Sequence, residues 1–130
     1  MSDFREMRRK RQQLSDEESI GILQRSTSGT LALLGDNGYP YAVPISYVYS
    51  EGKLYFHSAL TGHKVDAIRN YDKASFCVID KDDVQPEKYT TYFRSVIAFG
   101  RIRIIEDEVE KYLVIDITRI RMKQIGRAHV

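Results

Sequence analysis

Apolar and polar residues alternate along most of the chain, with the period of two that is typical of β-strands. The alternation is clearest between residues 98 and 105, where Ile102 and Ile104 are expected to face inward and the arginines beside them outward. Strands are predicted for the segments of this kind: 30–34, 39–50, 53–58, 73–80, 89–107 and 114–122. The sequence is therefore expected to fold mainly as β-structure.

Turn residues separate these strands. "GDNG" at 35–38 and "EG" at 51–52 predict tight turns, and "KDDVQPEK" at 81–88 predicts a polar loop. Proline cannot donate a hydrogen bond to a neighbouring strand. Pro40 and Pro44 therefore predict that the second strand lies at a sheet edge, or that these positions form a bulge or a strand start.

Two short helices are predicted between the strands. Ser15 followed by Glu18 fits a capping box, and the helix that it opens is expected to bury Ile20 and Leu23. A second helix is predicted over residues 63–70, with a single apolar face. Both helices are too short and too amphipathic to form a core by themselves, so they are expected to pack against the strands.

Five or six strands joined by hairpins, with two short helices, predict an antiparallel barrel or a strongly curled sheet. Gly100 interrupts the longest strand and is expected to form a bulge or bend. One domain is predicted over residues 15–124, after a basic N-terminal arm at 1–14. The last residues, "IGRAHV" at 125–130, lack a clear period and match the translation of a DNA-sequencing adapter, so we interpret them as a non-native tail.

Composition and charge narrow the classes of function. The formal net charge of +2 is too small to indicate nucleic-acid binding by itself. The basic run at 5–11 is interpreted as a solvated arm, with a tail for nucleic acid or an anionic membrane as the alternative. Cys77 is the only cysteine, so no internal disulfide can form, and its apolar neighbours predict a packed side chain. The sequence shows no membrane span and no signal peptide, so the cytoplasm is the expected compartment.

A junction between strand and helix, "HSALTGHK" at 57–64, gathers polar groups that suit an anion. Helix N-termini carry free N–H groups and a partial positive charge. Gly62 lets a ligand approach the backbone, and Ser58 and Thr61 supply hydroxyl groups. Lys64 in the first helical turn opposes the helix dipole unless an anion lies there. The spacing thus predicts a phosphate monoester site, while a surface loop without a ligand stays equally open.

Two histidines belong to the same junction, His57 and His63. A metal site is not predicted, because no third ligand lies near them in the sequence. A nucleophilic serine paired with histidine is not predicted either, because no G-x-S-x-G motif is present. The remaining interpretations are isolated surface histidines or a histidine beside a ligand ring.

Residues 29–78 and 89–107 resemble the nitroimidazole-resistance branch of the pyridoxamine 5'-phosphate oxidase-like proteins. The most informative motifs are "VPISYVY", "LYFHSA", "GHK" and "RSVIAFGR", which occur in the order that the family has. The resemblance implies a mainly β fold with short α-helices, an antiparallel split β-barrel of the FMN-binding type. It also implies a homodimer that holds FMN in the groove between its subunits.

The resemblance further implies which residues contact the cofactor. Lys64 and the start of its helix would hold the phosphate, and His57 would lie beside the flavin as the candidate catalytic residue. The other implied contacts come from three segments: Val43, Pro44 and Tyr47 beside the isoalloxazine, Ser58 and Ala59 along the flavin and ribityl chain, and Arg94, Ser95 and Val96 from the long strand. No metal ligand is implied. Deazaflavin or haem in place of FMN remains open.

An FMN-dependent oxidoreductase is the expected function, one that passes electrons from a reduced nicotinamide to a small acceptor, with a nitroaromatic as one candidate. The family's arginine-rich strand pattern for pyridoxamine phosphate oxidation is absent here, so that activity is not expected. A longer helical segment that the family has after "EKYL" is also absent, which keeps a non-catalytic flavin-binding or sensing module as an alternative. A third interpretation is a nucleic-acid binder that stacks bases on Tyr47, Tyr49 and Tyr55, although these residues are expected to pack as barrel walls.

Overall fold

The computed structural model of the chain describes residues 16–57, 62–85, 90–106 and 111–129, and within them the side chains outside 81–93 and 124–129. Two α-helices and one 3-10 turn occur in these residues: α1 (Asp16–Arg25), α2 (His63–Asn70) and η2 (Asp36–Gly38). Seven strands accompany them: β1 (Ser28–Leu34), β2 (Pro40–Ser46), β3 (Val48–Ser50), β4 (Lys53–His57), β5 (Lys73–Gln85), β6 (Thr90–Glu106) and β7 (Lys111–His129).

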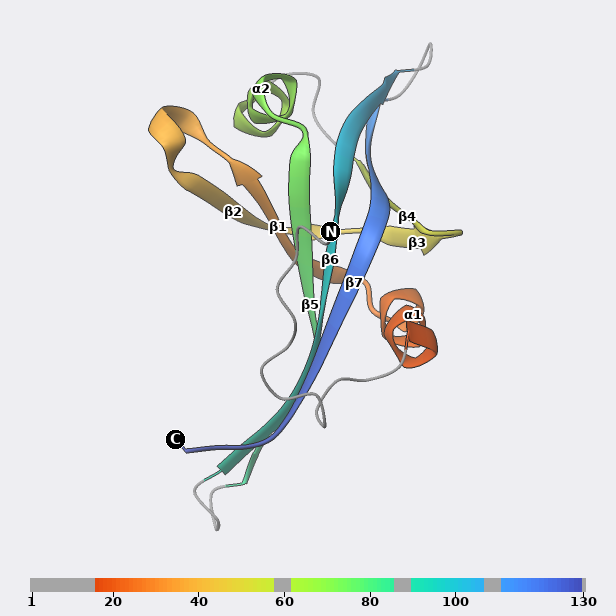
Figure 1. Cartoon of the computed structure of the whole chain (residues 1–130), viewed down its shortest axis with the longest axis vertical. Helices are drawn as coiled ribbons and strands as arrows, with labels where there is room; N and C mark the ends of the chain where they lie inside the picture. Colours follow the sequence, from red (N-terminus) through yellow and green to blue (C-terminus); the bar gives the residue numbers. More distant parts are fainter. Residues whose placement is uncertain (1–15, 58–61, 86–89, 107–110, 130) are drawn as a thin grey trace, which may run out of the picture.

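The seven strands form one antiparallel sheet in the order β2-β1-β5-β6-β7-β4-β3. β2 and β4 are five places apart in this order, yet residues of the two strands come into contact. The sheet therefore curls around one of its faces, as Figure 1 shows, and forms a partly closed barrel. The predicted fold class, a mainly β antiparallel split barrel with short helices, is confirmed.

Edge positions and turns follow the chemistry of the sequence. β2 is an edge strand, which explains how Pro40 and Pro44 fit into the sheet without donating to a second neighbour. The turn between β1 and β2 is closed by the Gly35 N–H, which donates to the Tyr39 carbonyl at 2.7 Å. Both features confirm the sequence predictions for this hairpin.

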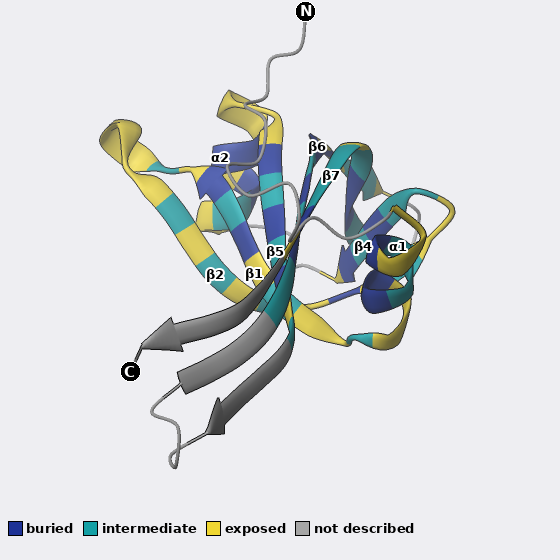
Figure 2. Cartoon of the chain, turned by 60° about the horizontal axis from the view of Figure 1, so that its bottom comes forward, coloured by how far each residue is buried: buried dark blue, intermediate teal, exposed yellow. Residues whose placement is uncertain are grey.

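The core fills the inner face of the curled sheet, and buried and exposed positions alternate along β1 and β5 in Figure 2. Phe76 of β5 lies at its centre. Its ring meets Tyr47 and Phe56 edge to face, with centroids 4.9 and 5.1 Å apart. Edge-to-face pairs of buried rings add to the stability that their buried area supplies. One face of β1, β5 and β6 is thus buried in the core.

The helices cover the core at two places. α2 buries Val65 and Ile68, the apolar face that the sequence predicts. α1 buries Ile22 and Leu23, whereas the sequence predicts Ile20 and Leu23. Ile20 is only half-buried because the buried side of this ten-residue helix is centred near Ile22, one position away from the predicted stripe.

Residues 81–85 correct the predicted polar loop at 81–88. Their backbone continues β5 and pairs with β6 up to Gln85 opposite Thr90. The polar composition indicated a loop, but an antiparallel neighbour satisfies the backbone of a polar strand equally well. The rest of that predicted loop, 86–89, lies outside the described residues.

Gly100 confirms the bulge predicted in the longest strand. The register of β6 and β7 shifts between Phe99 and Gly100. A Cβ at Gly100 would collide with the Asp116 carbonyl of β7. Only glycine lets the two backbones approach so closely at the bulge.

The predictions for the two ends of the chain are tested least by the structure. The basic arm at 1–14 lies outside the described residues, as does the capping residue Ser15. The backbone of 125–129, interpreted from the sequence as a non-native tail, continues β7 and pairs with β6.

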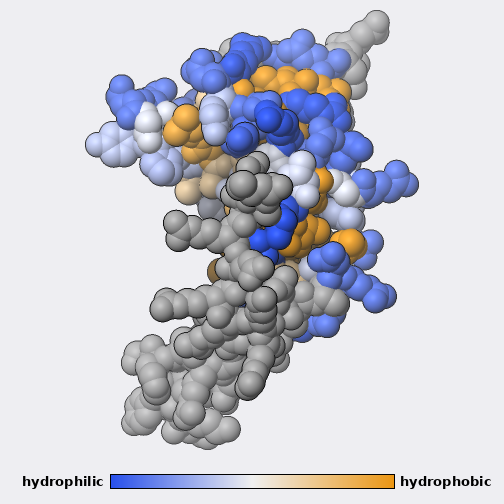
Figure 3. Space-filling model, in the orientation of Figure 1, coloured by the Kyte–Doolittle hydropathy of each residue, from blue (hydrophilic) through white to orange (hydrophobic). Residues whose placement is uncertain are grey.

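The surface mixes polar and apolar residues. On the face seen in Figure 3, hydrophobic residues reach the surface in separate patches among hydrophilic ones. Neither described helix is long and apolar enough to span a membrane.

Candidate functional site

The junction between β4 and α2 has the form that the sequence predicts. α2 starts at His63, and its N-cap residue Gly62 has φ +130° with open space where a side chain would stand. The first bond of the helix runs from the Asp66 N–H to the Gly62 carbonyl at 3.1 Å. The N–H groups before Asp66 therefore have no acceptor within the helix, and N–H groups in this position attract anions.

Contacts of His63 fix the start of α2 against the turn between β1 and β2. The His63 ring stacks on Tyr41 of β2, with centroids 4.1 Å apart and an interplanar angle of 16°. Its Nε2 lies 3.7 Å from a carboxylate oxygen of Asp36. These two contacts hold the first turn of the helix in place, and with it the half-buried Lys64.

His57 ends β4 with an exposed side chain. Its ring lies beside Tyr112 of β7, with centroids 4.9 Å apart and a tilt of 49°. Alternation along β4 puts Leu54 and Phe56 in the core and His57 on the opposite face, as predicted. His57 is thus accessible to a ligand from outside the barrel. Ser58 and Ala59, the next predicted contacts, lie outside the described residues.

The predicted contacts from β2 and its neighbourhood face different ways. Val43 packs against the core, whereas Pro44 is exposed on the outer side of the sheet. Tyr47 is 6% exposed, and its hydroxyl donates to the Leu23 carbonyl at 2.7 Å. Burial raises the pKa of the Tyr47 hydroxyl above its ordinary value. The side chain of Tyr47 therefore joins α1 to the barrel.

The predicted contacts from β6 also alternate between the two faces. Val96 is fully buried in the core, and Ser95 is half-buried on the outer face. Arg94 turns inward, and its Nη2 donates to an Asp80 oxygen at 2.8 Å. Of these three side chains, the one on the outer face is Ser95.

Asp80 joins Arg94 to the last turn of α1. Arg25 donates to both carboxylate oxygens of Asp80, from Nε at 3.1 Å and from Nη2 at 2.9 Å. Burial alone would raise the pKa of the Asp80 carboxyl, but the hydrogen bonds and charges of Arg25 and Arg94 outweigh it and lower that pKa. The arrangement is an ion-pair cluster that fastens α1 to the sheet.

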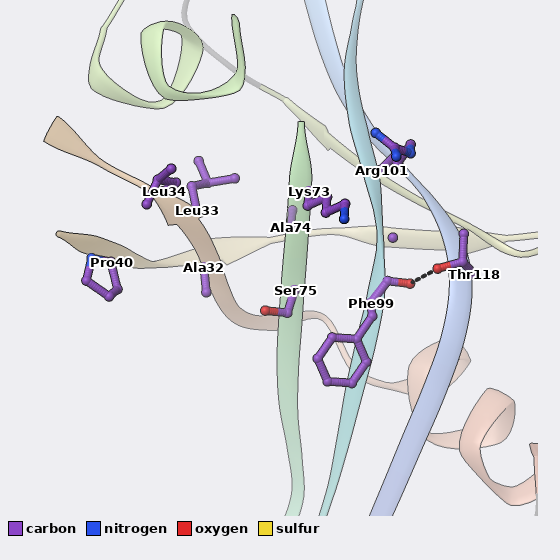
Figure 4. Close-up of a pocket in the computed structure, with 11 residues that line it drawn as sticks. Ala32, Leu33, Leu34, Pro40, Lys73, Ala74, Ser75, Phe99, Arg101 and Thr118 are labelled. Atoms are coloured by element: carbon purple, nitrogen blue, oxygen red, sulfur yellow. Dashed lines mark hydrogen bonds between the residues drawn. The ribbon is translucent and has the colours of Figure 1, made fainter. Parts of the chain in front are cut away.

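A hollow of about 700 Å³ lies on the outer face of the sheet, as Figure 4 shows. Ala32, Ser75 and Phe99 stand in one row across β1, β5 and β6 at its floor. Arg101 lies at its margin, and the Thr118 hydroxyl donates to the Phe99 carbonyl at 3.2 Å. Sequence reasoning did not single out this hollow, although the same period of two that identifies the inner residues also identifies the outer ones.

None of the predicted site residues that the structure describes lines this hollow. The strand register instead divides them between two ends of the sheet. His57 pairs with Tyr112, and Tyr112 with Ile105 of β6, whereas Ser95 is ten positions away on the same strand. At about 3.3 Å per residue the two rows are roughly 30 Å apart along β6.

Lys64 is also far from Ser95. Ser95 pairs with Ile79, beyond Cys77, which pairs with Thr30 near the start of β1. Lys64 lies by the turn at the other end of that strand, roughly 20 Å away. Lys64 and His57 are therefore at one end of the barrel wall, and Ser95 is at the other.

Metal binding finds no support in the described residues. No group of three or more histidine, cysteine, aspartate or glutamate side chains lies close enough there to hold an ion. Cys77 is half-buried, and burial raises the pKa of its thiol, so its reactive thiolate form is disfavoured.

Comparison with known proteins gives one family match. Residues 15–124 match the family model described as pyridoxamine 5'-phosphate oxidase. No curated protein sequence matches the chain. The matched segment covers both helices and most of the sheet.

Several solved structures share the fold. A candidate 5-nitroimidazole antibiotic resistance protein from Bacteroides thetaiotaomicron is 15% identical, with a TM-score of 0.76 over 88% of this chain and 87% of that one. An FAD-binding protein from Mesorhizobium loti is 22% identical, with a TM-score of 0.72 over 88% and 97%. An FAD-binding protein from Mycobacterium smegmatis is 25% identical, with a TM-score of 0.69 over 87% and 96%.

Proposed function

The chain belongs to the pyridoxamine 5'-phosphate oxidase family, and from this premise we propose that it is a flavoprotein that binds FMN. The observation that carries the proposal is the start of α2, where Lys64, the open position at Gly62 and the free helix N–H groups meet. A phosphate monoester, in which FMN ends, fits these groups. Two similar structures are of FAD-binding proteins, which supports a flavin as the ligand.

Different residues of the chain would bind different parts of the cofactor. Lys64 and the N–H groups of α2 would hold the phosphate, and the exposed ring of His57 would lie beside the flavin and meet the substrate. Pro44 would supply an apolar contact from the exposed side of β2. FMN, when bound, would supply the electron transfer, and these side chains would bind it, orient it and limit the access of water.

The build of the phosphate site favours FMN over other cofactors. The start of α2 offers one compact anion site, which matches a ligand with a single terminal phosphate. FAD has a second phosphate and an adenosine, and haem has no phosphate. FAD, haem and deazaflavin are each outcomes that a spectrum and mass of the bound group would reveal.

The reaction that we propose is the transfer of electrons from a reduced nicotinamide to a small acceptor. A nitroaromatic is a candidate acceptor, because one similar structure is of a candidate 5-nitroimidazole resistance protein. Reduced nicotinamide is plentiful in the cytoplasm, which is the compartment expected from the sequence. Oxidation of pyridoxamine phosphate is not proposed, since the arginine-rich strand pattern for it is absent from the sequence.

A flavin-binding or sensing module without turnover is the second candidate. The exposure of His57 at the end of β4 favours it, because an exposed ligand ring reacts with less control than an enclosed one. The two candidates differ in one observable. Bound flavin that NADH and NADPH both fail to reduce under anaerobic conditions indicates the module, and rapid bleaching of the flavin indicates the enzyme.

An absorption spectrum of the purified protein tests the proposal. We expect a yellow protein whose flavin is released on denaturation and identified as FMN by mass. If the protein is colourless, titration with FMN should restore the flavin spectrum with one FMN for each chain. A colourless protein that binds no added FMN contradicts the proposal.

A further inference from the structure

His63 joins the first turn of α2 to the turn between β1 and β2. Its ring lies nearly parallel to that of Tyr41, at an angle of 16° and with centroids 4.1 Å apart. Its Nε2 lies 3.7 Å from a carboxylate oxygen of Asp36. In the proposed function Lys64 and the helix start hold the phosphate, whereas His63 has no assigned role. We call Asp36, Tyr41 and His63 together the His63 cluster.

The β1–β2 turn gives this cluster a defined support. The Gly35 N–H donates to the Tyr39 carbonyl at 2.7 Å, and the Tyr39 N–H donates to the Asp36 carbonyl at 3.1 Å. A Cβ at Gly35 would stand 2.8 Å from the Tyr39 carbonyl oxygen and 3.4 Å from Nε2 of His63. Glycine therefore lets the imidazole lie close against a turn whose own hydrogen bonds fix its shape.

The first turn of α2 depends on the His63 cluster more than the rest of the helix does. Val65 and Ile68 are at most 5% exposed and hold the middle of the helix to the core. The side chain of His63 is 40% exposed, and Lys64 is half-buried. Loss of the contacts of His63 should therefore loosen the helix start and leave the rest of α2 in place.

The charge of the imidazole matters at this position. An imidazole changes its charge between about pH 5 and 8. A cation in the first turn opposes the helix dipole, and a protonated His63 would stand there beside Lys64. A phosphate at the helix start would offset both charges, so protonation of His63 and binding of a phosphate should favour each other.

The charged and titratable groups around His63 come from the hairpin and from its own helix. Asp36 and Tyr41 face the ring from the hairpin, and the face of a tyrosine ring attracts a cation. Lys64 and Asp66 follow in the first turn of α2. Asp36 is 80% exposed, so its ion pair with His63 is weak by itself. A phosphate, with up to two negative charges, would be the stronger partner of a protonated His63.

We propose that His63 is a positioning residue for the flavin phosphate, which ties the start of α2 to the β1–β2 turn and, when protonated, strengthens the hold on the phosphate. This step rests on the proposed function. Two unit charges several ångströms apart near a protein surface change a binding constant by about threefold to tenfold. FMN should therefore bind more tightly at low pH, and the gain should be lost as the pH rises through the range in which an imidazole loses its proton.

Hydrogen exchange at the Asp66 amide, whose bond to Gly62 closes the first turn, tests the tie to the hairpin without reference to flavin. His63→Ala and Tyr41→Leu should each speed this exchange by about threefold or more. The double variant should exchange no faster than either one, because both substitutions remove the same contact. Tyr39→Leu is the matched control, since the Tyr39 side chain is 74% exposed in the same turn, and its exchange rate should be unchanged.

Titration with FMN between about pH 6.5 and 8.5 tests the role of the proton. The unaltered chain and His63→Gln share every other titrating group, including His57 and the phosphate itself, so the ratio of their affinities reports His63. This ratio should rise at least about threefold from the higher pH to the lower one. A merely structural role would lower the affinity of His63→Gln by the same factor at each pH. Riboflavin, which lacks the phosphate, should give a ratio that does not change with pH.

Each outcome decides one part of the assignment. Unchanged exchange at Asp66 in both His63→Ala and Tyr41→Leu would overturn the tie to the hairpin. A ratio of FMN affinities that stays constant with pH, or one that rises equally for riboflavin, would overturn the role of the protonated ring at the phosphate. If no form of the protein binds FMN, the proposed function fails and the phosphate role fails with it. The exchange at Asp66 then still decides whether His63 ties α2 to the hairpin.

Discussion

The inner and outer faces of the same curled sheet differ in how fully one chain satisfies them. On the inner face, Phe56 and Phe76 are at most 1% exposed and meet edge to face. On the outer face, Ile79 remains 60% exposed and a hollow of about 700 Å³ lies between Phe99 and Leu34. The inner face is packed within the chain, whereas the outer face leaves Ile79 and Leu34 exposed.

This difference shows that the residues that stabilise the fold and the residues that we connect with function lie in different parts of the molecule. Most inner positions of β1, β5 and β6 are apolar and form the core, which the fold needs whatever the protein does. The end of β4, the exposed side of β2 and the start of α2 carry the residues that we connect with flavin. Substitutions on the two faces should therefore change different measured quantities.

The largest expected effect is a loss of stability from Phe76→Ala. Removing a fully buried ring that contacts Tyr47 and Phe56 leaves a cavity and should lower the free energy of unfolding by about 3–5 kcal/mol. Urea denaturation followed by circular dichroism measures the change.

Phe99→Ala is the matched control on the outer face. Its ring is only half-buried, so the loss of stability should be smaller than in Phe76→Ala. Equal losses for the two variants would remove the distinction between the faces.

The next effect concerns ligand affinity at the end of the barrel. Lys64→Ala should weaken FMN binding by about 1–3 kcal/mol, the range of a charge-assisted hydrogen bond, and leave the fold intact. Fluorescence titration with FMN measures this change. Lys53→Ala on β4, whose amine lies 3.9 Å from Asp116, is the control and should bind FMN normally. Unchanged affinity in Lys64→Ala would mean that the phosphate lies elsewhere.

A smaller effect, with a pH dependence, is expected at the ion-pair cluster under α1. Asp80→Asn should lower the free energy of unfolding by about 1–2 kcal/mol at neutral pH. Because Arg25 and Arg94 lower the pKa of the Asp80 carboxyl below its ordinary 3.8, its contribution is present above that value and disappears as the pH falls through the lowered pKa. The variant should therefore lose less stability than the unaltered chain on acidification.

Asp72→Asn is the control for this cluster. Asp72 forms a similar pair with Arg101, but the two side chains are 51% and 61% exposed, so the loss should be under about 1 kcal/mol. Urea denaturation of both variants between neutral and acidic pH checks the comparison. If Asp72→Asn lost as much stability as Asp80→Asn, the account that burial makes the Asp80 ion pairs stronger would be contradicted.

The smallest effect is expected at the contact between α1 and the barrel. Tyr47→Phe removes the hydroxyl that donates to the Leu23 carbonyl, and it should lower the free energy of unfolding by about 0.5–1.5 kcal/mol. FMN affinity should stay the same, because this hydroxyl is already engaged inside the chain. A stable variant with weakened FMN binding would instead place the hydroxyl at the ligand.

Much of the fold could be predicted because each local signal agrees with its neighbours. The helix at 63–70, the glycine bulge at Gly100 and the edge position of Pro40 and Pro44 all follow from backbone chemistry that the sequence displays directly. The polar segment at 81–85 could not be predicted in this way. Its strand conformation depends on pairing with β6, which lies farther along the chain.

How the predicted site residues lie relative to one another could not be predicted from the sequence, for reasons of geometry. Consecutive residues such as Arg94, Ser95 and Val96 resemble one motif in the sequence, yet a strand directs their side chains to alternate faces. The roughly 30 Å between His57 and Ser95 follows from strand register, and no short motif encodes register. The hollow beside Phe99 has the same cause, since residues from five strands build it.

Titration of the unaltered chain, Lys64→Ala and Lys53→Ala with FMN, followed by absorbance, tests the central claim most directly, because the claim assigns the flavin phosphate to the start of α2. The account predicts a flavin spectrum with one FMN for each chain in the unaltered protein and in Lys53→Ala, and weaker binding in Lys64→Ala. Equal affinity in all three, or no binding by any of them, would contradict the account.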